Sequence, residues 1–169
     1  MKLPVVLLLG KIPPPYMGPS IATRILLDSS LKDRCRLIHL DTRAHHSLES
    51  MGRFGIAKLF RTLWIYSRMK LLILRYWPNL VIIPVSQSTM GFFKDSWYMI
   101  IAKVFFRRAV FHLRGSNFRN WYESAPAFFK LYVRVMLSWC DGVIVQGEKL
   151  RPIFHGLVPD DRIRVVPNG

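Results

Sequence analysis

The sequence has little cysteine. Its 169 residues contain only Cys35 and Cys140, and these form no CxxC pair. A disulfide-stapled scaffold or a cysteine zinc site needs more cysteines at closer spacing, so both are excluded. We expect a reducing compartment. Apolar residues make up 51% of the chain, which is enough for a packed core and excludes intrinsic disorder.

Acidic residues are also scarce. The chain has 10 Asp and Glu against 25 Lys and Arg, a formal net charge of +15. The acidic residues form no close pair except Asp160 and Asp161, which are typical of a solvated turn, so a two-carboxylate hydrolase is disfavoured. A positive excess favours anionic partners: nucleic acid, phospholipid headgroups or a phosphate-bearing substrate. Because the basic residues are scattered, they indicate a charged face on a folded body rather than a basic tail.

Long hydrophobic runs are missing. The longest apolar stretches are residues 3–9 and 80–85, far short of the roughly 18 residues that a spanning helix needs. Residues 1–9 have some features of a signal peptide. However, Pro4 interrupts the run, Lys11 closes it, and no small-residue cleavage site follows. We therefore expect a buried first strand rather than a signal peptide.

Short apolar runs alternate with helical stretches along the whole chain. Strands are expected at residues 3–9, 36–41, 80–85, 109–113, 142–145 and 162–166. Helices are expected at residues 18–31, 56–77, 92–107, 127–139 and 148–155, and residues 42–50 are expected to form a loop. This alternation predicts parallel strands joined by right-handed crossovers. The expected fold class is α/β, with a Rossmann-like, doubly wound, mainly parallel sheet of about six strands.

The usual nucleotide motifs are absent, since neither GxGxxG nor GxxxxGK[ST] occurs. Ligands of open parallel sheets bind beyond the carboxyl ends of the strands, where residues 10–20 form the first candidate segment. Gly18 at a helix N-terminus would let a phosphate or carboxylate approach free backbone N–H groups. Pro19 suits the first helical position. An ordinary turn with a glycine cap is an equal alternative.

Two further segments follow later strands. His112 and Arg114 lie two apart on one strand, so they point to the same face, where they suit polarising a sugar hydroxyl or holding a phosphate. A satisfied core histidine is the alternative for His112. Gly147 and Glu148 follow the next strand, and the favoured role of Glu148 is structural, in the first turn of a helix. The adjacent pair His45 and His46 lacks further ligands, so we expect no metal site.

The expected helix at residues 56–77 carries both cations and aromatic rings. Arg61, Arg68 and Arg75 are seven residues apart and share a face. Trp64 and Trp77 are among the aromatics of this helix. Such a helix can rest on anionic lipid. Alternatively, its aromatic side chains fill the core and its arginines are simply solvated.

Three passages resemble the N-terminal domain of GT-B glycosyltransferases, of the large retaining group called family four or group one. They are the first strand with the loop at residues 13–20, the strand and loop at residues 110–118, and the stretch at residues 141–169 that leads to the hinge. The resemblance covers essentially the whole chain. It implies one half of a GT-B fold, with residues 1–169 as the acceptor-side domain. A C-terminal donor-binding domain is expected after the turn at residues 167–169.

The resemblance implies transfer of a sugar, with retention, from a nucleotide-sugar donor to a hydroxyl of a polysaccharide or lipid-linked glycan. The nucleotide-diphosphate sugar is the co-substrate and no cofactor is implied. This domain alone is expected to be inactive, and the protein is expected in the cytoplasm, at the inner membrane face. His112 and Arg114 are the implied catalytic residues, and which of them contacts the sugar stays open. The implied donor- and acceptor-binding residues are Met17, Gly18, Pro19, Ser20, Gly115, Ser116, Asn117, Gly147 and Glu148.

Two other functions fit the same composition. One is a Rossmann-like binding module without catalysis, and the other is a basic nucleic-acid-binding domain. The sequence contains no RRM, KH or helix-turn-helix signature, and its charge is not gathered into one recognition element. We therefore expect no nucleic-acid partner.

Overall fold

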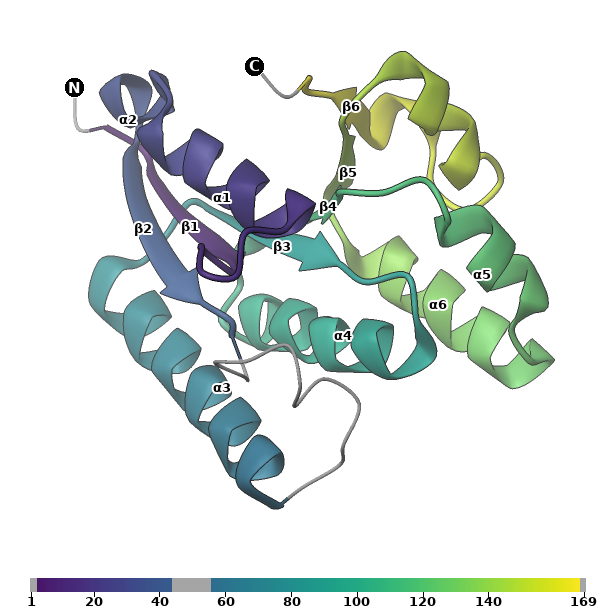
Figure 1. Cartoon of the computed structure of the whole chain (residues 1–169), viewed down its shortest axis with the longest axis horizontal. Helices are drawn as coiled ribbons and strands as arrows, with labels where there is room; N and C mark the ends of the chain where they lie inside the picture. Colours follow the sequence, from purple (N-terminus) through teal and green to yellow (C-terminus); the bar gives the residue numbers. More distant parts are fainter. Residues whose placement is uncertain (1–2, 44–55, 168–169) are drawn as a thin grey trace. The chain divides into compact units, whose positions relative to one another are not determined.

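The computed structural model describes residues 3–43 and 56–167. Six strands form one parallel sheet in the order β2-β1-β3-β4-β5-β6 (Figure 1). The strands are β1 (Val5–Gly10), β2 (Arg36–Asp41), β3 (Leu80–Val85), β4 (Arg108–Leu113), β5 (Gly142–Val145) and β6 (Ile163–Val165). The predicted α/β class with a doubly wound parallel sheet is thus confirmed. The chain divides into two compact units, Met1–Val81 and Ile82–Gly169.

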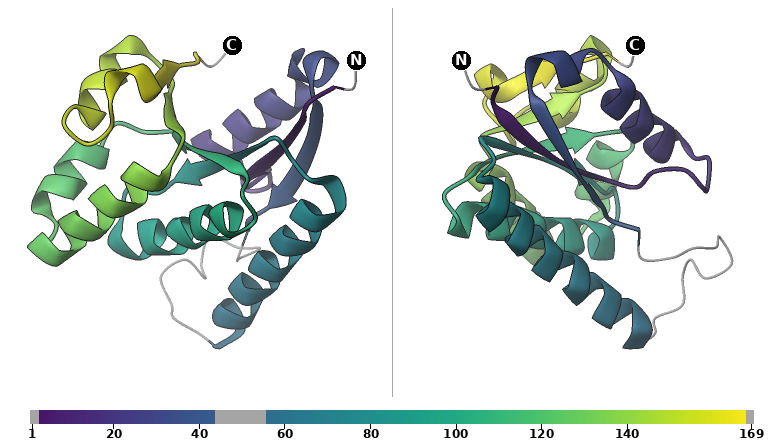
Figure 2. Two further views of the ribbon diagram at one scale, coloured as in Figure 1. Left: turned by 180° about the vertical axis from the view of Figure 1, so that it is seen from behind. Right: turned by 90° about the vertical axis from the view of Figure 1, so that its left-hand side faces the viewer.

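The first unit is built on the β1–β2 pair, which runs in register from Val5 opposite Arg36 to Gly10 opposite Asp41. Helices α1 (Gly18–Asp28) and α3 (Ile56–Tyr76) lie on opposite faces of this pair (Figure 2). The short helix α2 (Leu31–Arg34) precedes β2. Coverage on both faces explains why β1 is apolar throughout, because neither side of the strand meets water.

The second unit contains α4 (Thr89–Val104), α5 (Phe118–Ser124), α6 (Ala127–Trp139) and the 3₁₀ turns η2 (Glu148–Phe154) and η3 (Asp160–Arg162). Phe92 of α4 lies at the centre of an aromatic cluster. Its ring centroid is 5.9 Å from that of Phe111 on β4, 6.1 Å from Phe118 and 5.5 Å from Trp121 on α5. This cluster joins two helices to β4, so the loop between β4 and α5 has a fixed start and a fixed end.

Several helical elements differ from the sequence-based expectation. The short elements α2 and η3 were not predicted, and the helix expected at residues 148–155 is the 3₁₀ turn η2. α4 begins at Thr89 rather than at residue 92, because Gly91 lies inside its first turn and Ser88 supplies the extended N-cap. It ends at Val104 rather than at residue 107, since Phe106 turns to a positive φ of 55°. Helix α5 was not predicted at all. It is only seven residues long and is fixed by burial of Phe118 and Tyr122, which contact the core from one side of the helix.

The remaining predicted boundaries agree with the structure to within a few residues. The expected helix at residues 18–31 ends at Asp28, where Ser29 is extended. α3 ends at Tyr76, just before Trp77 with its positive φ of 46°. Residues 44–50 of the expected loop, with His45 and His46, lie outside the described residues. Within the described part of the chain, no helix is long and apolar enough to cross a membrane.

Candidate functional site

The carboxyl end of β4 presents the two residues predicted to be catalytic. Strand alternation sends Phe111 toward α4, where it meets Phe92, so His112 points to the opposite face of the sheet. His112 is nonetheless only 3% exposed. Arg114 is half-buried just beyond the strand. Its Nε lies 3.5 Å from Nδ1 of His112, a long hydrogen bond in which the guanidinium donates.

His112 is neutral at physiological pH. Burial, and next the positive charge of Arg114, lower the pKa of His112 to about 4. Because Nδ1 faces a donor, the proton of the neutral ring resides on Nε2. Among the described residues, Nε2 has no hydrogen-bond partner although it is buried. His112 therefore presents an unused N–H donor, and unused buried donors in native proteins call for an explanation.

Arg114 supplies the positive charge beside this donor. Burial lowers the pKa of its guanidinium to about 10, which leaves it protonated at neutral pH. A charged donor next to a neutral N–H donor can hold an oxygen-rich anion or orient a hydroxyl. The sequence predicted a sugar- or phosphate-binding role for this pair, and that role stays a prediction.

The loop after β4 is held by Gln87, which follows β3. The Oε1 of Gln87 accepts a hydrogen bond of 2.7 Å from the backbone N–H of Asn117. A Cβ placed on Gly115 would lie 2.1 Å from Nε2 of Gln87, so only glycine allows this close approach. Ser116 and Asn117 are exposed at the loop. Gln87 thus fixes the backbone that carries three of the predicted binding residues.

Sequence reasoning missed both Gln87 and Asp95. Asp95 of α4 is only 3% exposed and accepts a 2.9 Å hydrogen bond from the backbone N–H of Ser86. Lys94 lies 3.3 Å from the same carboxylate. These contacts fix the start of the segment that carries Gln87. The polar stretch Ser86-Gln87-Ser88 directly after a buried strand was the only available signal.

Gly147 and Glu148 follow β5, which pairs in parallel with β4. They therefore lie at the same edge of the sheet as Arg114 and Gly115. Glu148 is exposed and lies 3.7 Å from Arg151, in keeping with a surface role. A Cβ on Gly147 would meet nothing within 4 Å, so packing does not require glycine there.

The loop after β1, in the first unit, is held from both sides. Ser20 is buried, and its hydroxyl donates to the carbonyl of Pro15 at 2.7 Å and accepts from the N–H of Met17 at 3.0 Å. Arg43 donates to the carbonyl of Pro14 at 2.9 Å. The hydroxyl of Ser20 therefore stabilises the loop itself. Pro19 lies in the first turn of α1, as predicted.

Met17, Gly18 and Pro19 lie exposed at the start of α1. A Cβ on Gly18 would meet nothing within 4 Å, so open space lies in front of this backbone. The predicted ligand approach is thus sterically free at Gly18. The residues predicted for one site belong to the two units, with 17–20 in the first and 112–117 and 147–148 in the second.

A metal site was not expected. Among residues 3–43 and 56–167, no group of three or more His, Cys, Asp or Glu side chains could hold a metal ion. Both cysteines are buried thiols, and burial raises the pKa of Cys140 to about 11.

No protein-family model matches the sequence, and no curated protein sequence matches it either. Solved structures do resemble the fold. A Listeria monocytogenes protein assigned as a UDP-N-acetylglucosamine 2-epimerase aligns with a TM-score of 0.63 at 9% identity, over 96% of this chain and 45% of its own. S. aureus MnaA, solved with UDP, aligns with a TM-score of 0.58 at 11% identity, over 98% of this chain and 44% of its own.

These similarities concern the fold. The chain spans less than half the length of either structure. Its architecture matches half of a GT-B-like structure, as the resemblance implied.

Proposed function

We propose that the chain is the acceptor-side domain of a retaining glycosyltransferase that uses a nucleotide-diphosphate sugar. The observation that carries the proposal is the neutral, buried His112, with a free Nε2–H beside the charged Arg114 at the end of β4. A sugar hydroxyl can accept from Nε2–H, while the guanidinium holds a developing negative charge. The GT-B-like half-fold, and the UDP bound to S. aureus MnaA, support a nucleotide sugar as co-substrate.

In this proposal a second domain completes the enzyme. That domain would hold most of the donor, and the 169-residue chain by itself would be inactive. The backbone N–H of Gly18, at the start of α1, would approach the donor diphosphate. Pro19 has no N–H, and the N–H groups of Ser20 and Ile21 already donate to the carbonyl of Met17. The acceptor would be a polysaccharide or a lipid-linked glycan at the cytoplasmic face of the membrane.

A nucleotide-sugar 2-epimerase is the second candidate, because the similar structures include a protein assigned to that activity. The two functions differ in what they consume. A glycosyltransferase releases nucleoside diphosphate only as an acceptor is glycosylated, whereas an epimerase converts its substrate without an acceptor.

The test uses the protein of the complete reading frame with UDP-N-acetylglucosamine and UDP-glucose, each with and without a membrane-lipid and polysaccharide extract. We expect acceptor-dependent release of UDP and labelled product. His112→Ala and Arg114→Ala should each be assayed, and the larger loss of kcat identifies the sugar contact. Gly18→Val should abolish transfer without unfolding the protein, since its side chain meets only open space. Arg164→Ala, an exposed residue of β6, is the matched control.

Acceptor-independent conversion of the sugar would replace the transferase proposal with the epimerase. Full activity of both His112→Ala and Arg114→Ala would remove the end of β4 from the mechanism.

A further inference from the structure

Helix α3 has two apolar sides, and only one of them packs in the fold. Ile65, Met69 and Ile73 recur every four residues and are at most 5% exposed. On other sides of the same helix, Phe60 is 68% exposed, Trp64 65% and Leu71 64%. Isolated exposed apolar residues are normal, but a contiguous group marks an interaction surface. In one of the two sequence-based alternatives, the aromatic side chains of this helix fill the core. Phe60 and Trp64 do not fill it, whereas Tyr66 and Tyr76 are half-buried.

The exposed residues form a stripe along the helix. At about 100° per residue, they fall within an arc of about 100°, roughly opposite the buried side. We call this stripe the outer face of α3; its members are Phe60, Leu63, Trp64, Leu71 and Leu74. The helix turns this apolar strip to the outside over roughly four turns, with the exposed Ser67 as a polar residue within it.

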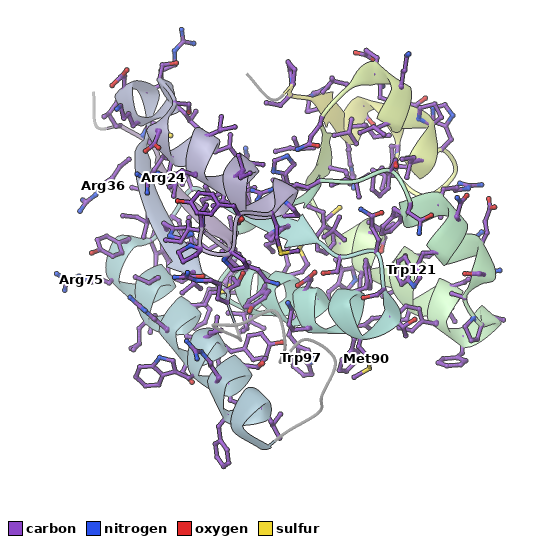
Figure 3. All side chains as sticks on the ribbon, in the orientation of Figure 1. Arg24, Arg36, Arg75, Met90, Trp97 and Trp121 are labelled. Atoms are coloured by element: carbon purple, nitrogen blue, oxygen red, sulfur yellow. The ribbon has the colours of Figure 1, made fainter. Side chains whose placement is uncertain are left out.

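Cations line both edges of this strip. Lys70 falls on one side of the outer face, and Arg68 and Arg75 fall on the other. All three side chains are exposed, and Arg75 extends away from the fold (Figure 3). The sequence of Ile56–Tyr76 contains no Asp or Glu at all, so no carboxylate of the helix neutralises these charges.

We propose that the outer face of α3 rests on an anionic phospholipid surface, with the helix axis in the plane of the membrane. Trp64, Phe60 and the leucines would enter the boundary between headgroups and acyl chains, and the flanking cations would contact lipid phosphates. The net charge of +15 adds long-range attraction to the same surface. A second copy of the chain fits less well, because a symmetric contact through α3 would bring like charges together.

The biological role of this lipid contact, which is to hold the enzyme beside a lipid-linked acceptor, rests on the proposed function. The surface itself is defined by α3, which contributes no residue to the candidate site. Vesicle binding and sugar transfer can therefore be measured separately. If the protein bound anionic vesicles but transferred no sugar, that result would count against the proposed function and not against the lipid surface.

The experiment measures binding of the full chain to phosphatidylcholine vesicles with and without phosphatidylglycerol, by flotation. We expect binding to the anionic vesicles, with at most weak binding to phosphatidylcholine alone. The double variant Phe60→Ser/Trp64→Ser should lose about tenfold or more of the affinity, since two rings no longer enter the lipid. Arg68→Gln/Arg75→Gln should lose about 20- to 30-fold on anionic vesicles.

Matched controls change the same residue types elsewhere. Phe106→Ser removes a ring that is 89% exposed, and Arg108→Gln/Arg164→Gln removes two exposed cations. Both controls should bind vesicles nearly as well as the unmodified chain, and circular dichroism establishes that all variants are folded. An equal loss of vesicle binding in the controls, or unchanged vesicle binding of the α3 variants, would overturn the proposal. It would also be overturned if light scattering showed a dimer of the unmodified chain that the α3 substitutions dissociate.

Discussion

His112 is buried, as a core histidine would be, but it is not the satisfied core histidine that the sequence allowed as an alternative. A core histidine and a ligand-binding histidine differ in whether the ring nitrogens are used. Here Nδ1 faces Arg114 at 3.5 Å, and Nε2 has no partner among the described residues. Burial keeps the imidazole neutral, so Nε2–H can donate a hydrogen bond without carrying a positive charge.

The lowered pKa of His112 predicts how stability changes with pH. The imidazole protonates near pH 6.5 in the unfolded chain but only near about 4 in the folded protein. Between these values the unfolded state binds more protons, so the free energy of unfolding falls as the pH is lowered through that window. The full effect is about 3 kcal/mol. Urea titrations at several pH values should show this slope, and it should be absent in His112→Gln. Parallel pH profiles for the two proteins would mean that His112 is not buried as a neutral group.

Gly115 provides a second prediction, about the loop that carries the site. Gly115→Ala places a Cβ against the amide of Gln87, which must move and give up its hydrogen bond to Asn117. We expect a loss of about 1 kcal/mol in unfolding free energy. In a Gln87→Ala background the same substitution should cost much less, and this double-mutant cycle tests the contact.

Gly147→Ala is the matched control for that cycle. A Cβ at Gly147 meets nothing within 4 Å, so the substitution should leave the denaturation midpoint nearly unchanged. An equal loss at both glycines would mean that backbone freedom, rather than contact with Gln87, explains the effect.

At the scale of the elements, the sequence predicted those with a clear period. β2, β3, β5 and α6 begin and end where expected, because their apolar runs stop at turn residues or at proline. α5 lacks such a signal, since seven residues give less than two turns of pattern. Its formation depends on the tertiary cluster around Phe92.

The candidate site was predictable where it follows local strand geometry. The proximity of His112 and Arg114 was predicted because residues two apart on a strand share a face, and their role in a site stays a prediction. Gln87 and Asp95 were not found because their roles arise from contacts between segments distant in the sequence, such as Gln87 with Asn117. The role of Ser20 was also hidden, since its hydroxyl bonds to the backbone of the preceding loop.

Substitutions on the two apolar sides of α3 should differ strongly in how much they lower stability. Met69 is fully buried, so Met69→Ala should lower the unfolding free energy by about 2–5 kcal/mol. Trp64→Ser changes an exposed side chain and should stay within about 0.5 kcal/mol of the unmodified protein. Chemical denaturation measures both. A large loss for Trp64→Ser would show that the outer face is covered by another part of the chain, contrary to the lipid interpretation.

At the scale of the whole molecule, the composition and the fold answer different questions. The alternation of strands and helices determined the architecture, which matches half of a GT-B-like structure. The net charge of +15 says nothing about the fold but favours anionic partners. Nucleic acid and anionic lipid would both be attracted by this positive charge. They differ because apolar side chains would contribute to binding of lipid and not of nucleic acid.

Salt therefore separates the two partners. Binding to duplex DNA would rest on phosphate contacts alone, so its affinity should be weak, on the order of 10⁻⁴–10⁻⁶ M, and should fall steeply as salt rises. Binding to anionic vesicles would retain the apolar contribution of the outer face of α3, which salt does not screen. We expect DNA binding to be lost between about 50 and 200 mM salt while part of the vesicle binding persists, as followed by fluorescence anisotropy and flotation at matched salt. Tight, sequence-dependent DNA binding without vesicle binding would instead identify nucleic acid as the partner of this charge.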